Sequence, residues 1–322
     1  SRCQREGRGF DPLCPLQLKV IKSKFITSIF QKYLINRDIR IFKKSLIYYF
    51  LFRVIRNFLS KNIILNIYKF KVYGSTNKNK TSYFLLKKCE FGDYHELATI
   101  KKISNKNKIL FLDCGCNYGF YSLYAASLSK QNKIISVEAS KKTLEELRKN
   151  LNLNNFSNIK LLNKAISETD ENIITFNEST KDWESSISHQ NYKTYESSTI
   201  KSIKIDTLVQ DYDIKEYKII IKLDIEGNEM SGIQGSLEVV EKSSPLIIIE
   251  FSKYIFNKKD NIEYLKNFLI RYDYSIYDTN NNKRNLDNIL ISLDNLSKRR
   301  QTIGNFYLIK NSSKILEEFL SL

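Results

Sequence analysis

Residues 109–122, ILFLDCGCNYGFYS, constrain the fold of this chain more than any other stretch. Their apolar run ends in Asp113 and breaks at once into a turn that holds Gly115 and Gly119, after which residues 120–128 form an amphipathic segment. A buried strand, a loop that lets a ligand approach the backbone, and a helix are, in this order, the first unit of a doubly wound α/β fold. The stretch therefore predicts a nucleotide-like ligand at the N-terminus of the helix.

A second unit of the same kind follows. Residues 133–138, KIISVE, predict another buried strand that ends in a carboxylate. Glu138 comes 19 residues after Gly119, near the spacing at which an acid binds ribose hydroxyls. The ends of the two strands therefore indicate one adenosine site.

The spacing of the glycines indicates which adenosine ligand this is. A dinucleotide fingerprint, G-x-G-x-x-G, cradles a pyrophosphate with backbone amides. Here Asn117 stands at the position of the second glycine, between Gly115 and Gly119, so a pyrophosphate would fit poorly. Asp113 suits an ammonium group, and S-adenosylmethionine combines such a group with an adenosine. The alternative is a tight strand-to-helix turn in an α/β protein without this ligand.

Residues 159–166, IKLLNKAI, predict a third strand. Its end would lie beside the adenine, so Asn163 and Ala165 are predicted cofactor contacts. Residues 167–199 form an insertion before the next strand and contain His189, which could act as a base. A solvated loop histidine is the favoured interpretation of that residue.

Residues 217–229, YKIIIKLDIEGNE, place a buried strand before a cluster of charges. Lys222, Asp224 and Glu226 alternate and are expected on one face of this strand, at the end where open α/β sheets bind ligands. Three ionisable groups on one face of a buried strand are costly without partners or solvent, so the pattern favours a functional edge. The alternative is an ion pair between Lys222 and Asp224, with Glu226 or Glu229 capping the next helix.

Together these residues resemble the FkbM family of S-adenosylmethionine-dependent methyltransferases, whose motifs run D-x-G-A-N-x-G-x-x-S, a strand-end acid, I-D-x-L, K-x-D-x-E-G-x-E, G-A and P-x-x-x-x-E. The resemblance covers about residues 90–310, and KLDIEGNE is its most specific part. It implies a Rossmann-like class I methyltransferase fold with a mostly parallel seven-stranded sheet, and it places Ser122 among the cofactor-binding residues. The chain departs from the pattern, without losing a ligand-type group, at Cys116, Asn228 and Ser236.

The resemblance also implies O-methylation of a hydroxyl on a sugar, glycan or other small metabolite. Methyl transfer is an in-line displacement in which positioning supplies most of the rate. A hydroxyl acceptor needs a base for its proton, and Asp224 and Glu226 are the candidates, with Lys222 as a third catalytic residue. Two other functions stay open. One is an RNA methyltransferase, against which the chain lacks the D/N-P-P-Y pattern after its fourth strand, and the other is a non-catalytic module that binds S-adenosylmethionine.

Charge is distributed unevenly along the chain. Residues 1–108 carry a net charge of +18 and residues 109–322 a net charge of −1. Residues 18–73 hold 13 basic residues and one acid among apolar residues, and they predict basic amphipathic helices within an extension over residues 18–88. Their longest apolar run, residues 46–52, is too short to cross a bilayer. A packing extension is the favoured interpretation, contact with an anionic membrane surface comes second, and nucleic acid comes last because no nucleic-acid-binding motif is present.

Residues 1–17 differ in composition from the rest, because they hold two of the three prolines and no lysine. The peptide GFDP, residues 9–12, is what the T-arm of a transfer RNA gene would encode in frame, so we hypothesise a non-native or disordered leader. The expected organisation is this leader, the basic helical extension, a methyltransferase domain over residues 89–311 and a C-terminal helix over residues 312–322.

The cysteines indicate free thiols. Cys114-x-Cys116 has no second pair and lacks the spacing of a zinc site, so we expect no metal. Free thiols suit a reducing compartment. We therefore expect a cytoplasmic protein, at most peripheral at the inner face of the membrane.

Overall fold

The computed structural model describes residues 62–75, 82–83, 93–179, 195–297 and 301–321. The chain divides into two compact units, one of residues 1–66, 73–78 and 82–90 and the other of residues 67–72, 79–81 and 91–322. The larger unit holds the central sheet and every candidate site residue that the structure describes.

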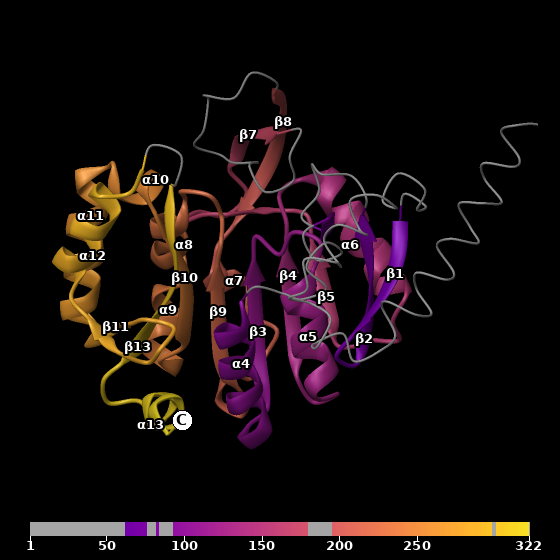
Figure 1. Ribbon diagram of the computed structural model, residues 1–322, viewed down its shortest axis with the longest axis horizontal. Coiled ribbons are helices and arrows are strands. Elements are labelled where there is room, and N and C mark those ends of the chain that lie inside the picture. The colour runs from indigo at the N-terminus through magenta and orange to yellow at the C-terminus, as the bar shows by residue number, and fades with distance from the viewer. Residues whose placement is uncertain (1–61, 76–81, 84–92, 180–194, 298–300, 322) are drawn as a thin grey trace, which may run out of the picture. The chain divides into compact units, whose positions relative to one another are not determined.

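A mixed sheet of eight strands forms the centre of the larger unit, counted over the described residues. Its strands are β3 (Ile109–Cys114), β4 (Lys133–Val137), β5 (Ile159–Leu162), β9 (Lys218–Leu223), β10 (Leu246–Ser252), β11 (Tyr274–Tyr277), β12 (Lys283–Arg284) and β13 (Thr302–Lys310). Their order is β12-β11-β13-β10-β9-β3-β4-β5 (Figure 1). The strands from β10 to β5 run parallel, and β13 pairs antiparallel with both β10 and β11. The expected doubly wound, mostly parallel fold is confirmed, and the two-residue β12 adds one strand to the expected seven.

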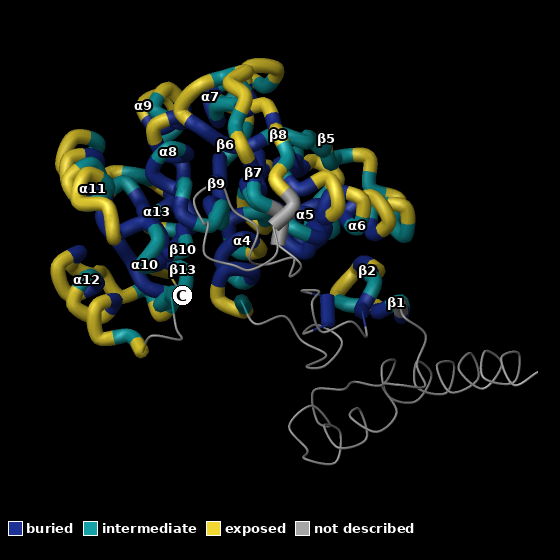
Figure 2. The backbone as a smooth tube through the Cα atoms, turned by 90° about the horizontal axis from the view of Figure 1, so that it is seen from above, coloured by how far each residue is buried: buried dark blue, intermediate teal, exposed yellow. Residues whose placement is uncertain are grey.

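Helices cover both faces of this sheet. They are α4 (Tyr94–Lys106), α5 (Phe120–Leu128), α6 (Lys141–Asn152), α7 (Ile205–Leu208), the 3₁₀ turn Ile214–Glu216, α8 (Glu229–Gln234), α9 (Leu237–Ser243), α10 (Lys253–Phe256), α11 (Lys259–Arg271), α12 (Leu286–Asp294) and α13 (Lys314–Leu320). The six helices from α7 through α12 pack in one apolar cluster against the face of the sheet that carries Leu112 and Ile221. On the opposite face, Thr99 of α4 donates a hydrogen bond to Tyr307 of β13, whose ring contacts Phe319 of α13. The strands are accordingly buried and the outer faces of the helices exposed (Figure 2).

The insertion after the third strand forms a second, smaller sheet. The strand expected over residues 159–166 is interrupted after β5, and β6 (Ala165–Ile166) pairs with β8 (Tyr195–Ile203) instead. β8 pairs in turn with β7 (Ile173–Ser179), which gives the order β6-β8-β7. Figure 1 shows the β7–β8 hairpin above the edge of the central sheet at which β3, β4 and β9 end.

The expectation of a helical extension is wrong for residues 62–75, which form a hairpin of β1 (Asn62–Ile67) and β2 (Phe70–Ser75). Buried residues alternate with more exposed ones along the start of β2, and Tyr68 in the turn has a φ of 52°, both typical of a hairpin. The leader, residues 1–17, and residues 18–61 lie outside the described residues. Within the described part of the chain, no helix is long and apolar enough to span a bilayer.

Candidate active site

Asp113 lies at the end of β3 as a buried carboxylate. Ser122, in the first turn of α5, donates a hydrogen bond to Asp113 Oδ2 at 2.5 Å, and its hydroxyl also lies 2.7 Å from that of Ser136. Asp113 Oδ1 has no hydrogen-bond partner within the described residues. Burial raises the pKa of Asp113, and the nearby Lys222 opposes this rise. A buried carboxylate with one unsatisfied oxygen is suited to a ligand that donates a hydrogen bond or carries positive charge.

Both glycines of the loop after β3 have a backbone conformation that favours glycine, and Gly115 also lies against the main chain of Asp224. Gly115 has a φ of +78°, and a Cβ at this residue would lie 1.9 Å from the main-chain oxygen of Asp224. Gly119, the N-cap of α5, has a φ of +84°, and its Cβ would lie 2.0 Å from Leu147 Cδ1 in α6. Only glycine adopts this conformation without strain and also permits these approaches. The absence of a side chain at Gly115 therefore lets the loop after β3 pack against the main chain at the end of β9.

Glu138, directly after β4, is held by main-chain amides. Its Oε2 accepts a hydrogen bond from Asn117 N and its Oε1 one from Ser140 N, each at 2.9 Å. Burial raises its pKa to about 7, although these two hydrogen bonds act in the opposite direction. The Asn163 side chain donates to the main-chain oxygens of Glu138 and Ala139 at 2.8 and 2.9 Å. The carboxylate expected to bind ribose hydroxyls is thus fixed by its neighbours on both sides.

The structure brings most of the predicted cofactor residues together at the ends of β3 and β4. The residues that meet there are Asp113, Gly115, Asn117, Gly119, Ser122, Glu138 and Asn163. The side chain of Ala165 is buried in a small apolar cluster with Phe176 and Ile200, against which Ala139 packs. His189 lies outside the described residues.

Lys222 is a buried cation in β9. Its Nζ lies 2.6 Å from Asp224 Oδ2 and 4.7 Å from the centre of the Tyr121 ring, and Asp113 is its neighbour in the parallel ladder. Burial acts to lower its pKa, but the carboxylates of Asp224 and Asp113 outweigh burial and hold the pKa above its usual value. Lys222 and Asp224 therefore form the ion pair that was the alternative interpretation of the sequence.

The expected alternation of charges along the strand stops at Leu223, where β9 ends. Glu226 has a φ of +53° and Gly227 a φ of +100°, so the chain turns sharply and Glu226 does not continue the face of Lys222. Glu229 is buried and accepts hydrogen bonds from Ile225 N at 3.0 Å and from Gly227 N at 2.9 Å. It stabilises the turn before α8, but both of these amides precede that helix, so the helix cap of the alternative interpretation is not formed by Glu229.

Carboxylates crowd the edge beyond β9. Burial raises the pKa of the half-buried Glu226 well above its usual value, and Asp224 and then Glu250 add to the shift. Burial likewise raises the pKa of Glu229 to about 7. Glu250, in β10, has its pKa raised to about 8 by burial and by Asp224. Glu250 was not among the predicted site residues, although it follows an apolar run as Asp113 does and could have been found by that signal.

The family is decided by a comparison with models of protein families. Residues 113–276, just over half of the chain, match the model described as the methyltransferase FkbM domain. The chain belongs to the FkbM methyltransferases. No curated protein matches the sequence.

Solved structures with a similar arrangement share little sequence with this FkbM methyltransferase. The FkbM methyltransferase of Methylobacillus flagellatus KT is 19% identical with a TM-score of 0.38, and the match covers 70% of this chain and 52% of that one. The precorrin-6y C5,15-methyltransferase of Geobacter metallireducens GS-15 is 13% identical with a TM-score of 0.34, over 66% and 84% of the chains. M. jannaschii TYW2 in complex with AdoMet is 11% identical with a TM-score of 0.39, over 78% and 87%. The present chain thus spans about half the length of the first of these proteins.

S-adenosylmethionine is the methyl donor of this family, and the residues at the ends of β3 and β4 fit it. The unsatisfied Asp113 Oδ1 suits its ammonium group, and the anchored Glu138 carboxylate suits its ribose hydroxyls. Bound there, the cofactor supplies a methyl group on a sulfonium, whose departure leaves a neutral thioether. Within the described residues, no group of His, Cys, Asp or Glu side chains could hold a metal ion.

Proposed function

We propose that this FkbM methyltransferase transfers a methyl group to a hydroxyl oxygen of a sugar or another small metabolite. The observation that carries the proposal is the crowding of carboxyl groups at the ends of β9 and β10, beside the residues suited to the cofactor. In the reaction, a bond forms between the acceptor oxygen and the methyl carbon while the carbon–sulfur bond breaks. The hydroxyl proton must pass to a base at the same edge.

Glu226 is the best candidate for this base. Its raised pKa gives the carboxylate a greater affinity for a proton near neutral pH, which favours general base catalysis. Asp224 is tied to Lys222 at 2.6 Å. The buried Lys222 is accordingly a positioning residue that fixes Asp224, rather than a group that reaches the acceptor.

The sequence of the loop supports an oxygen acceptor over a base nitrogen of nucleic acid. The chain reads Asp224-Ile225-Glu226-Gly227 where amino-directed nucleic-acid enzymes carry D/N-P-P-Y. The membrane contact that came second among the interpretations of residues 18–73, and the cytoplasmic location, stay predictions.

Substitution of Glu226 tests the proposal. With the full chain, S-adenosylmethionine and a panel of monosaccharides and polyols, release of S-adenosylhomocysteine should identify an acceptor, and mass spectrometry should place the methyl group on oxygen. We expect Glu226→Gln to lower kcat by about 10²–10⁴-fold, because the acceptor loses its base. The exposed Glu263→Gln serves as the matched control and should leave kcat unchanged. A methyl group found on nitrogen, or equal rates for the two variants, would contradict the proposal.

A further inference from the structure

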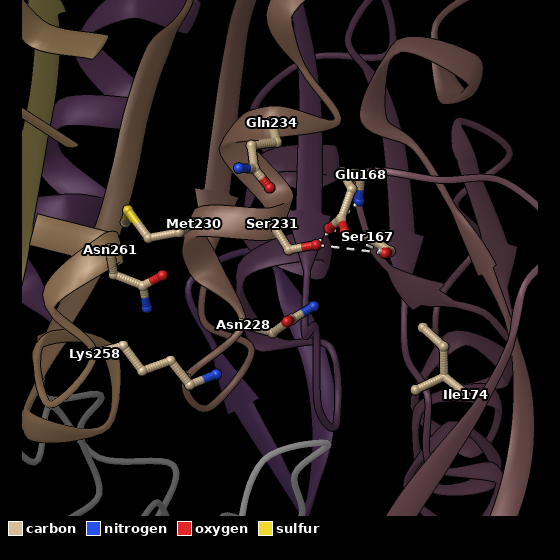
Figure 3. A pocket seen from close by; sticks show the side chains of 10 residues that line it. Ser167, Glu168, Ile174, Asn228, Met230, Ser231, Gln234, Lys258 and Asn261 are labelled. Carbon is tan, nitrogen blue, oxygen red and sulfur yellow. Dashed lines mark hydrogen bonds between the residues drawn. The ribbon is translucent and has the colours of Figure 1, made fainter. Parts of the chain in front are cut away.

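A polar cavity of about 240 Å³ is lined in part by Gly227 and Asn228, in the loop before α8 (Figure 3). Its walls come from the segment after β6, from β7, from the loop before α8, from α8 itself and from the start of α11. The residues that line it are Ser167, Glu168, Ile174, Gly227, Asn228, Met230, Ser231, Gln234, Lys258 and Asn261. Gly227 and Asn228 directly follow Glu226, so a molecule in this cavity contacts the same loop as the proposed base.

Two amide side chains in the cavity present hydrogen-bond acceptors. Asn228 Nδ2 donates to the main-chain oxygen of Ile166 at 2.9 Å, and Asn261 Nδ2 donates to that of Ile255 at 2.8 Å. These bonds fix both amides, and Figure 3 shows both side chains in the lining of the cavity. Fixed carbonyl oxygens are acceptors for the hydroxyl groups of a polyol.

Charge and hydroxyl groups complete the lining. Lys258 reaches toward Asn228 in Figure 3, and its ammonium forms no ion pair or side-chain hydrogen bond among the described residues. The hydroxyls of Ser167 and Ser231 lie 3.4 Å apart, too far for a strong bond, on the opposite wall. The exposed Lys258 ammonium is therefore available to an anion at the mouth of the cavity.

We propose that this cavity binds one sugar ring of the acceptor, and that the ring carries an anionic group beside Lys258. The inference rests on the proposed O-methylation and narrows its substrate class. The volume of about 240 Å³ lies below the range of ~300–1,000 Å³ that is typical for drug-sized ligands, so a single ring fits better than an extended chain. Hydroxyl groups of the ring would donate to Asn228 Oδ1 and Asn261 Oδ1, and Glu168 offers a further acceptor.

Binding of glucuronate and of glucose to the full chain, measured by calorimetry with S-adenosylhomocysteine present, tests the proposal. We expect glucuronate to bind up to about fivefold more tightly than glucose, since an exposed ion pair contributes up to about 1 kcal/mol. Lys258→Gln should remove this difference, and Lys259→Gln, at the neighbouring exposed lysine that does not line the cavity, should keep it. Asn261→Leu should weaken the binding of both sugars.

Two results would overturn the assignment. One is glucose binding as tightly as glucuronate to the unchanged protein, and the other is an equal effect of Lys258→Gln and Lys259→Gln. The methyl-transfer assay separates this failure from failure of the proposed function. If the Lys258→Gln and Asn261→Leu variants methylate sugars as well as the unchanged protein does, only the role of the cavity is contradicted. If the sugars bind as expected but none is methylated on oxygen, only the proposed reaction is contradicted.

Discussion

The parallel strands of this sheet end at one edge, and the two halves of that edge are built differently. At the ends of β3 and β4, the carboxylates of Asp113 and Glu138 accept hydrogen bonds from Ser122 and from main-chain amides. At the ends of β9 and β10, burial raises the pKa of both Glu226 and Glu250, Asp224 adds to both shifts, and Glu250 adds to that of Glu226. The first half is preorganised to hold a ligand, and the second is suited to exchange a proton.

Gly115 lies where the two halves meet, and its substitution should have the largest effect on stability. Gly115→Ala places a methyl group 1.9 Å from the main-chain oxygen of Asp224 at a φ of +78°. We expect the free energy of unfolding to fall by about 5 kcal/mol, measured by urea denaturation, because strain and a backbone clash combine. Gly304→Ala is the control, since Gly304 also has a positive φ, +115°, but open space around it. Strain alone should cost about 1–3 kcal/mol there, and equal losses for the two variants would contradict the close approach.

Lys222 is the cation that both halves share. Lys222→Met leaves the buried Asp113 and the paired Asp224 without their counter-ion. We expect a loss of about 3–5 kcal/mol in the free energy of unfolding, since breaking a buried ion pair strands a charge. Lys218→Met changes a half-buried lysine of the same strand and should cost much less. A Lys222 variant as stable as the Lys218 variant would show that the ion pair does not connect the two halves.

The pH dependence of methyl transfer tests whether a carboxyl group at the ends of β9 and β10 accepts the proton. A carboxyl base must be ionised, so kcat should rise with pH through the pKa of Glu226, which burial raises well above its usual value. From one pH unit below the apparent pKa to one unit above it, the rate should increase about tenfold. Glu250→Gln removes a negative neighbour of Glu226 and should shift this rise to lower pH. A profile that is flat, or that shifts to higher pH in this variant, would contradict the coupling.

The sequence predicted the first half well because its signals are local. The strand expected to end at Asp113 is β3, which runs one residue further, to Cys114, and the helix expected over residues 120–128 is α5 with the same bounds. A buried apolar run, a glycine turn and an amphipathic segment each leave a mark within a few residues. Asp113, Asn117 and Glu138 therefore meet where the pattern placed them.

The second half depends on contacts between distant segments. Two successive positive φ values, at Glu226 and Gly227, end the alternation that the strand suggested. The position of Glu250 beside this turn follows from the pairing of β10 with β9, which no local pattern specifies. The second sheet arises in the same way, since Ala165 pairs with Ser202 across a long insertion.

Calorimetric titration of S-adenosylmethionine into the unchanged protein and two variants tests the division between the halves most directly. We expect Glu138→Ala to weaken binding by about 10²-fold, because charged hydrogen bonds to the ribose are lost. Glu226→Gln should bind the cofactor with unchanged affinity, since that residue serves the acceptor. Normal binding by Glu138→Ala, or an equal loss in Glu226→Gln, would contradict the division.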